Sequence, residues 1–303
     1  MTMEQRYKTP QALDAVVTQA AKSSPQDTGR AKSDFLYDRF LERVFSEPNP
    51  RFVLKGGRSI LARTLDARRT LDVDFAYRGE DLDAAAEELI SLASKDMGDF
   101  YTFRYIERKR VAEGQEYRHG YKLRFNVFFG ATRDMGNISV DLVAGPVVGE
   151  GADVIAPVNR LAIKGLSASD YLVIPVPLAI ADKVCATMQT YPDGARSSRV
   201  KDLVDIVIYA LAEEIDADDL AKQIKREARL RGMTPIAEFE VPQEWHDLPP
   251  RGKRYAKDAR SANIPAEYCD IDAAEKLAKL LIDPALSGTV KGKRWNPSAV
   301  SWC

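Results

Sequence analysis

Apolar residues recur at helical and at strand spacing along the first half of the chain. Helical spacing is found in residues 10–22, 31–47 and 80–97. Short apolar or alternating runs, which are typical of strands, fill residues 52–55, 71–77, 100–111, 121–130 and the second part of 130–145. The polar residues 112–120 suit a hairpin connection between two of these strands. This half is therefore expected to combine helices with a sheet.

After about residue 175 the apolar pattern becomes helical. Helices are expected within residues 174–194, 199–214, 216–232 and 272–284. The sequence thus predicts an α+β, bilobal protein with a mixed β-sheet. Its first domain would span residues 1–175, including the N-terminal helices, and a helical domain at residues 176–303 would complete a cleft.

Composition narrows the class of protein. The chain has 303 residues, 45% hydrophobic and 29% charged, which is typical of a soluble globular protein. The net charge of −1 gives no general attraction to nucleic acid, so binding of that kind would need local basic patches. Three scattered cysteines and two histidines indicate a reducing cytoplasm and exclude a zinc framework. No signal peptide or membrane-spanning run is evident.

Two adjacent glycines, Gly56 and Gly57, stand between an apolar strand and a short helix expected after it. Glycine allows a tight turn and a close approach of the backbone to a ligand. The free N–H groups at the start of the helix favour an anion such as phosphate, and Ser59 could add a hydroxyl. A glycine pair after a strand is also common as a plain turn.

Asp72 and Asp74 lie two residues apart in an apolar strand and so share one face of it. Both stay ionised at little cost only if a cation lies between them, and Mg²⁺ prefers such oxygen ligands. Asp141 lies on a later apolar strand and would complete a three-carboxylate site for two metals. The alternative is a solvated strand face.

Lys183 lies in an otherwise apolar helix, and Asp202 and Asp205 share one side of the next helix. A lysine in such a helix is more often a surface residue whose stem is buried. Facing a triphosphate, it would neutralise phosphate charge. We expect a partly desolvated ammonium with Asp202, or a carboxylate of the cleft, as its counter-charge.

Together these motifs resemble a known family. The runs FVLKGGRSI, RRTLDVDF, PLAIADKVCA and RVKDLVDI, in this order, resemble the AbiEii/AbiGii nucleotidyltransferase toxins, which include the mycobacterial MenT toxins, within the DNA polymerase β-type nucleotidyltransferase superfamily. The resemblance covers roughly residues 30–215. It departs from the family in two respects: Arg58 intervenes between the glycines and Ser59, and the loop from Gly57 to Asp72 is slightly long.

The resemblance implies a role for each matching residue. Phosphates would be cradled by Gly56, Gly57 and Ser59, with Thr70 and Lys183 also binding the nucleotide. The metal ligands would be Asp72, Asp74 and, from the superfamily layout, Asp141. The catalytic set would be Asp72, Asp74, Asp141, Lys183 and Asp202, with Asp205 behind them. Mg²⁺ or Mn²⁺ would be the cofactor.

The function implied is that of a toxin of a toxin–antitoxin or abortive-infection system. It would add nucleotides from an NTP to an RNA, a tRNA 3′ end above all, and so block translation; a cognate antitoxin protein would restrain it. Two alternatives stay open: a nucleotidyltransferase that modifies a small molecule, and a non-catalytic nucleotide-binding module. If RNA is the acceptor, backbone contacts are expected in the basic segments 108–110, 224–232 and 290–295.

Overall fold

The computed structural model describes residues 7–65, 67–111, 120–145, 151–191, 193–247 and 249–303. The chain divides into two compact units, Met1–Leu65 with Thr70–Val173, and Asp66–Arg69 with Ile174–Cys303. The predicted α+β class is confirmed. The main break lies after Val173, and residues 66–69 group with the second unit. The domain boundary expected at residue 175 stays a prediction.

A mixed sheet forms the centre of the first unit. Its strands are β1 (Phe52–Lys55), β2 (Asp72–Tyr77), β3 (Tyr101–Arg110), β4 (Gly120–Phe129), β5 (Arg133–Ala144), β6 (Asp153–Ile155) and β7 (Tyr171–Val173). Their order across the sheet is β3-β4-β5-β2-β1-β7-β6. β2 pairs in parallel with β5, and β1 with β7, while the other pairs are antiparallel. Residues 112–119, most of the expected hairpin connection, lie outside the described residues.

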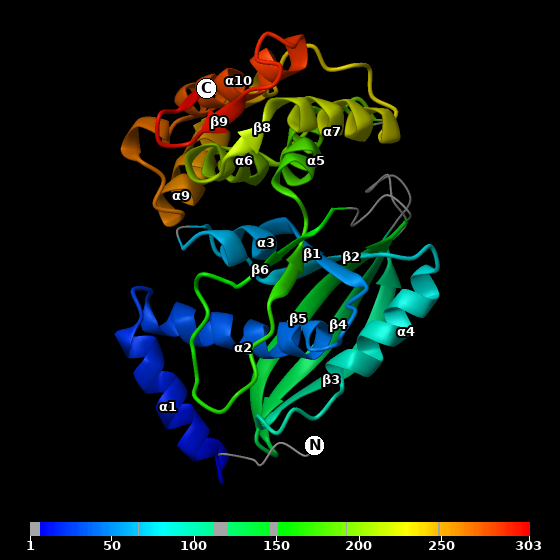
Figure 1. Ribbon diagram of the computed structural model, residues 1–303, viewed down its shortest axis with the longest axis vertical. Coiled ribbons are helices and arrows are strands. Elements are labelled where there is room, and N and C mark those ends of the chain that lie inside the picture. The colour runs from blue at the N-terminus through cyan, green and yellow to red at the C-terminus, as the bar shows by residue number, and fades with distance from the viewer. Residues whose placement is uncertain (1–6, 66, 112–119, 146–150, 192, 248) are drawn as a thin grey trace. The chain divides into compact units, whose positions relative to one another are not determined.

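Helices cover one face of this sheet. The helices of the unit are α1 (Pro10–Ser23), α2 (Thr28–Phe45), α3 (Gly56–Arg63) and α4 (Leu82–Ala93). α2 and α4 lie along the same face (Figure 1), where the Phe40 ring packs at 5.3 Å from Phe103 and 5.4 Å from Phe125. Because side chains alternate along a strand, the residues between these aromatics point to the opposite face.

A buried charge cluster fixes α2 to the loop before β3. Arg43 is fully buried and donates to both carboxylate oxygens of Asp99, at 2.9 and 2.8 Å, and to the carbonyl oxygen of Tyr101 at 2.7 Å. Arg39 donates to the same carboxylate at 2.7 Å. Burial acts to raise the pKa of Asp99, but the two guanidinium groups outweigh it and hold that pKa below its usual value.

The second unit is mainly helical. Its helices are α5 (Val176–Met188), α6 (Val200–Ala212), α7 (Ala217–Leu230), α8 (Glu244–Asp247), α9 (Pro249–Ser261), the 3₁₀ turn Ala266–Tyr268 and α10 (Ile271–Ser287). A small sheet joins β8 (Ile215–Asp216), β9 (Arg294–Asn296) and β10 (Ser301–Trp302) in the order β10-β9-β8. Within the described residues, no helix is long and apolar enough to cross a membrane.

The C-terminal segment is packed into the second unit. Trp295 is fully buried, and its indole N–H donates to the carbonyl oxygen of Ala210 at 2.7 Å. Sequence patterning missed this sheet and the helix that begins at Pro249, because short strands and a polar, proline-led helix give weak periodic signals. A proline in the first turn of a helix is tolerated, since its missing N–H would have no intrahelical partner there.

We expect Asp99→Asn to lower the free energy of unfolding by about 3–5 kcal/mol at pH 7, because it leaves two buried guanidinium groups without their carboxylate. The depressed pKa of Asp99 means that its contribution is present above the usual value of 3.8 and is lost as the pH falls. Urea denaturation at pH 7 and pH 3 measures both effects. Asp81→Asn, at the exposed start of α4, is the control, since Asn caps helices as well as Asp. Equal losses in the two variants would contradict this account.

Candidate active site

The three aspartates predicted as metal ligands lie on one face of the first unit's sheet. Asp72 and Asp74 alternate along β2 with the fully buried Val73 and Phe75. In the parallel pairing of β2 with β5, Asp74 stands directly opposite Asp141. All three aspartates are partly exposed. The register therefore sets two carboxylates side by side on neighbouring strands, with Asp72 one alternation away.

Lysines extend this row in both directions across the sheet. Lys55 of β1 is the partner of Asp74, and Lys122 of β4 is the partner of Asp141. The Lys122 ammonium lies 3.4 Å from a carboxylate oxygen of Asp141. Lys109 of β3 follows next to Lys122. The charged row thus runs Lys55, Asp74, Asp141, Lys122, Lys109, on the face that α2 and α4 do not cover.

The first glycine of the turn stands against one of these carboxylates. Gly56 begins α3 with a φ of 63°, in the left-handed region. A Cβ atom at this position would lie 2.0 Å from Oδ2 of Asp74. Only glycine leaves room for the carboxylate there. The start of the helix, with its partial positive charge, is consequently beside Asp74.

The other residues of the turn are held by contacts within the first unit. A Cβ atom at Gly57 would lie 2.9 Å from Cβ of Thr70. Ser59 is fully buried, and its hydroxyl donates to the carbonyl oxygen of Gly56 at 2.8 Å. In this conformation the hydroxyl is engaged inside α3, so the predicted phosphate contacts of Ser59 and of the glycines stay predictions.

Arg58, the residue that departs from the family pattern, has a structural role. It is buried and donates to Asp34 of α2 at 2.8 Å and to the carbonyl oxygen of Thr70 at 3.0 Å. Its guanidinium lies 3.5 Å from the centre of the Tyr37 ring. Arg58 therefore ties the glycine turn to α2 and to the residue two before Asp72.

The donor chemistry of the acidic row fits a hard divalent cation. Carboxylate oxygens are the ligands that Mg²⁺ prefers, and it commonly takes only one or two of them together with water and substrate phosphate oxygens. Asp74, beside Asp141 and one alternation from Asp72, matches this requirement. Among the described residues no group of three or more His, Cys, Asp or Glu side chains is assembled as a metal cage. The three-carboxylate site stays a prediction.

Lys183 forms a buried charge cluster in the second unit. Its ammonium lies 3.0 Å from Asp202 and 2.8 Å from Asp205, both fully buried on α6. The expected pairing with Asp202 is present, and Asp205 proves to be an equal partner. Arg199 donates to Asp202 at 2.5 Å, and Arg68 donates to both oxygens of Asp205 at 2.7 and 2.8 Å. These five side chains carry three positive and two negative charges.

The contacts shift the pKa values of the cluster in consistent directions. Burial acts to lower the pKa of Lys183, but Asp202 and Asp205 outweigh it and raise that pKa above its usual value of 10.5. Burial acts to raise the pKa of Asp205, but Lys183 and Arg68 outweigh it and lower the pKa. Asp202 raises the pKa of Arg199. Lys183, Asp205 and Arg199 are therefore charged at neutral pH.

The structure brings the predicted residues together within each unit. Asp72, Asp74, Asp141 and the glycine turn lie in the first unit, and Lys183, Asp202 and Asp205 in the second. The expected approach of Lys183 to the acidic strand stays a prediction. Sequence reasoning missed Arg68 and Lys122. Arg68 gave no signal, because it pairs with a residue 137 positions away, whereas Lys122 followed from the alternation of β4 once the strand was identified.

We expect Gly56→Ala to displace the Asp74 carboxylate. The backbone conformation alone costs an alanine roughly 1–2 kcal/mol, and the collision adds about 1–3 kcal/mol. Gly98→Ala is the matched control, since Gly98 has a φ of 65° but no described atom within 4 Å of the added Cβ. Urea denaturation should show the larger loss for Gly56→Ala. Equal losses would mean that Asp74 moves aside without cost.

Within the Lys183 cluster we expect Asp205→Asn to be more destabilising than Lys183→Met. Asp205→Asn leaves Lys183 and Arg68 as neighbouring buried cations and should cost about 3–5 kcal/mol. After Lys183→Met each aspartate keeps its guanidinium, so the loss should be nearer 1.5–3 kcal/mol.

Because the pKa of Lys183 is raised, its contribution is fully present below pH 10.5 and is lost as the pH rises through the pKa of the folded state. Chemical denaturation at pH 7 and pH 9 should therefore rank the two variants alike. If Lys183→Met were the more destabilising variant at either pH, the account of which charges each substitution leaves unpaired would be wrong.

The fold is similar to that of a solved nucleotidyltransferase toxin. MenT4, a nucleotidyltransferase toxin from Mycobacterium tuberculosis H37Rv, superposes with a TM-score of 0.53 at 16% identity, covering 90% of this chain and 88% of MenT4. A putative nucleotidyltransferase from Helicobacter pylori gives a TM-score of 0.46 at 14% identity, covering 85% of this chain and 96% of that protein. A comparison with curated proteins gives no match.

Family membership rests on the sequence. The family model described as "Nucleotidyl transferase AbiEii toxin, Type IV TA system" matches residues 39–279, which include the glycine turn, the three aspartates and the Lys183 cluster. The match spans well over half of the chain and includes the four runs of residues on which the resemblance was drawn. The chain belongs to the AbiEii nucleotidyltransferase toxin family of type IV toxin–antitoxin systems.

Proposed function

We propose that this toxin transfers a nucleotide from an NTP to a hydroxyl at the end of an RNA, with the 3′ end of a tRNA as the preferred acceptor. Transfer to that end would block translation, and a cognate antitoxin would restrain it. The observation that carries the proposal is the charged row of the first unit, in which the paired Asp74 and Asp141 are continued by Lys122 and Lys109 on the same face.

The aspartates would act on the triphosphate and on the attacking hydroxyl. Asp74, with Asp72, would hold Mg²⁺ or Mn²⁺, which when bound supplies charge stabilisation to the transferred phosphate. Asp141 would draw the acceptor hydroxyl towards the α-phosphorus and take part in removing its proton. A phosphorus–oxygen bond then forms to the RNA, the bond to the β-phosphate breaks, and pyrophosphate leaves.

The resemblance to the family assigns phosphate contacts to Gly56, Gly57, Ser59 and Thr70. It also assigns the triphosphate to Lys183, supported by Asp202. Because pyrophosphate gains charge as it leaves, a lysine contact there would act mainly on the rate. Lys183→Ala should then reduce transfer by roughly a hundred- to a thousand-fold.

The basic continuation of the row favours a polyanion over a small-molecule acceptor. Lys109 and Lys122 are exposed neighbours on β3 and β4, and the partly exposed Arg124 follows on the same face of β4. Glu107 lies between them, 3.1 Å from Lys109 and 3.4 Å from Arg124, so three cations share one carboxylate here. Arg108 and Arg110, which the sequence grouped with Lys109, point to the other face, where Arg108 lies 3.0 Å from Glu87 of α4. Of the three residues in this segment, only Lys109 lies on the acidic side.

Transfer is tested by incubating the protein and Mg²⁺ with total cellular RNA and each radiolabelled NTP in turn. We expect label in small RNA, and we expect Asp74→Asn and Asp141→Asn each to lose at least a hundred-fold in rate while remaining folded. Label in a small molecule instead of RNA would show that the acceptor is a small molecule and contradict the RNA proposal. If the folded protein binds NTP but transfers no nucleotide from any of them, it is a non-catalytic nucleotide-binding module and the proposal is wrong.

The basic row is tested by the double variant Lys109→Ala and Lys122→Ala. Its KM for RNA should rise, and the salt dependence of RNA binding should become shallower by about 0.7 in log–log slope for each phosphate that is no longer neutralised. Arg108→Ala, on the opposite face of the same strand, should leave both quantities unchanged. A weakening shared equally by Arg108→Ala would show a general charge effect and contradict the assignment of the row.

A further inference from the structure

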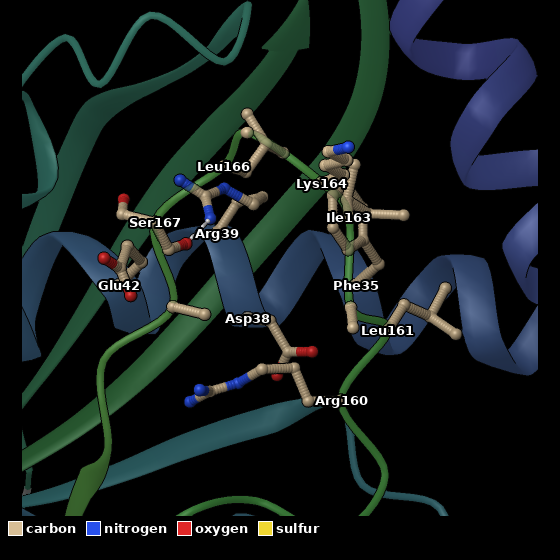
Figure 2. A pocket seen from close by; sticks show the side chains of 13 residues that line it. Phe35, Asp38, Arg39, Glu42, Arg160, Leu161, Ile163, Lys164, Leu166 and Ser167 are labelled. Atoms are coloured by element: carbon tan, nitrogen blue, oxygen red, sulfur yellow. Dashed lines mark hydrogen bonds between the residues drawn. The ribbon is translucent and has the colours of Figure 1, made fainter. Parts of the chain in front are cut away.

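The first unit also contains a cavity that the proposed reaction does not use. It lies between α2 and residues 160–168, and its volume is about 350 Å³, which is within the range of small-molecule sites. Phe35, Leu161 and Ile163 supply buried apolar walls. Figure 2 shows these side chains around Asp38, Arg39 and Arg160. α2 covers the apolar face of the sheet, so the cavity is separate from the acidic row on the opposite face.

Two polar groups in the wall of this cavity lack partners among the described residues. Arg39 is 3% exposed; its Nε binds Asp99 and its Nη1 donates to the carbonyl oxygen of Ser167 at 2.7 Å, but its buried Nη2 has no hydrogen-bond partner in the described part of the chain. The buried hydroxyl of Ser167 has none there either. Because Arg39 is hydrogen-bonded to the backbone of Ser167, as Figure 2 shows, the two donors without partners lie close to each other.

The charges around these donors favour an anion. Arg39 shares Asp99 with Arg43, so this buried trio has one positive charge in excess. Two carboxylates also line the cavity: Glu42 accepts from the backbone N–H of Ser169 at 2.6 Å, and Asp38 from the hydroxyl of Tyr171 at 2.8 Å. Both donors are neutral, so these negative charges count against the cations, and with Arg160 and Lys164 included the surroundings keep one positive charge in excess. The remaining charged lining residues, Arg160 and Lys164, are cations.

We propose that this cavity binds a small organic anion. Its carboxylate or phosphate group accepts hydrogen bonds from Nη2 of Arg39 and the hydroxyl of Ser167, and its apolar body packs against Phe35, Leu161 and Ile163. A buried donor without a partner costs free energy, more so when it is charged, and an acceptor from a ligand removes that cost. A neutral ligand of the same shape would leave the guanidinium uncompensated.

The site is tested by calorimetric titration of the full-length protein with hexanoate, hexyl phosphate and 1-hexanol, which share the apolar chain and differ in the head group. We expect saturable binding of at least one anion, roughly ten- to a hundred-fold tighter than hexanol, as expected for hydrogen bonds to a charged group. The tighter of the two anions identifies the head group. No saturable binding of either anion, or equal binding of hexanol, would overturn the proposal.

Two variants locate the binding. Ser167→Ala removes one donor without leaving a partner exposed, and Arg39→Lys keeps a cation beside Asp99 but loses the second nitrogen. Each should weaken the anion about tenfold. Thr187→Val is the matched control, because the hydroxyl of Thr187 is also buried without a partner among the described residues but belongs to α5 of the second unit. Binding unchanged by Ser167→Ala, or weakened equally by Thr187→Val, would place the anion elsewhere and overturn the site.

Discussion

The carboxylate of Asp74 occupies the space where a side chain at position 56 would stand. This contact decides the residue at the start of α3, its left-handed backbone and the position of that helix beside β2. It also sets a negative charge against the positive end of the helix, which offsets part of the repulsion among the neighbouring carboxylates. In sequence, Gly56 resembles part of a phosphate-binding turn. In the structure, glycine is required there because the Asp74 carboxylate fills the space of a side chain. Any phosphate has to be bound beside that carboxylate, which is the arrangement a bridging cation stabilises.

The two faces of the first unit's sheet differ in kind: one is a buried apolar face, and the other carries the aspartates. One face buries Val73, Phe75 and the aromatic residues that pack on α2, and these contacts hold the register of β2 with β5. A slip of one residue would turn Asp74 into the core and Val73 out to solvent. Stability and the placement of the acids therefore depend on the same register. A shifted register would lose the burial of Val73 and bury the charge of Asp74. Substitutions of the acids themselves touch none of this packing.

Sequence alone predicts those parts of the site that depend on local periodicity. Alternation puts Asp72 and Asp74 on one face, and helical spacing puts Asp202 beside Asp205. The register that pairs Asp74 with Asp141 joins residues 67 positions apart, and no local pattern specifies it. The same limit hid the pairing of Arg68 with Asp205 and the union of Arg39 with Ser167, which lie 137 and 128 positions apart. For basic residues the local reading was too inclusive. The run 108–110 was treated as one patch, but alternation along β3 places Lys109 on one face and Arg108 and Arg110 on the other.

Lys183 illustrates how a buried cation can be both stable and available. Its two aspartates each keep a guanidinium, so the ammonium is held by charges that do not depend on it for neutrality. A triphosphate that competes for the ammonium would leave Asp202 with Arg199 and Asp205 with Arg68. The free energy needed to redirect Lys183 is therefore smaller than for an isolated buried pair, in which removal of one partner strands the other charge. By neutralising the aspartates, Arg68 and Arg199 therefore lower the free energy needed to move Lys183 away from them.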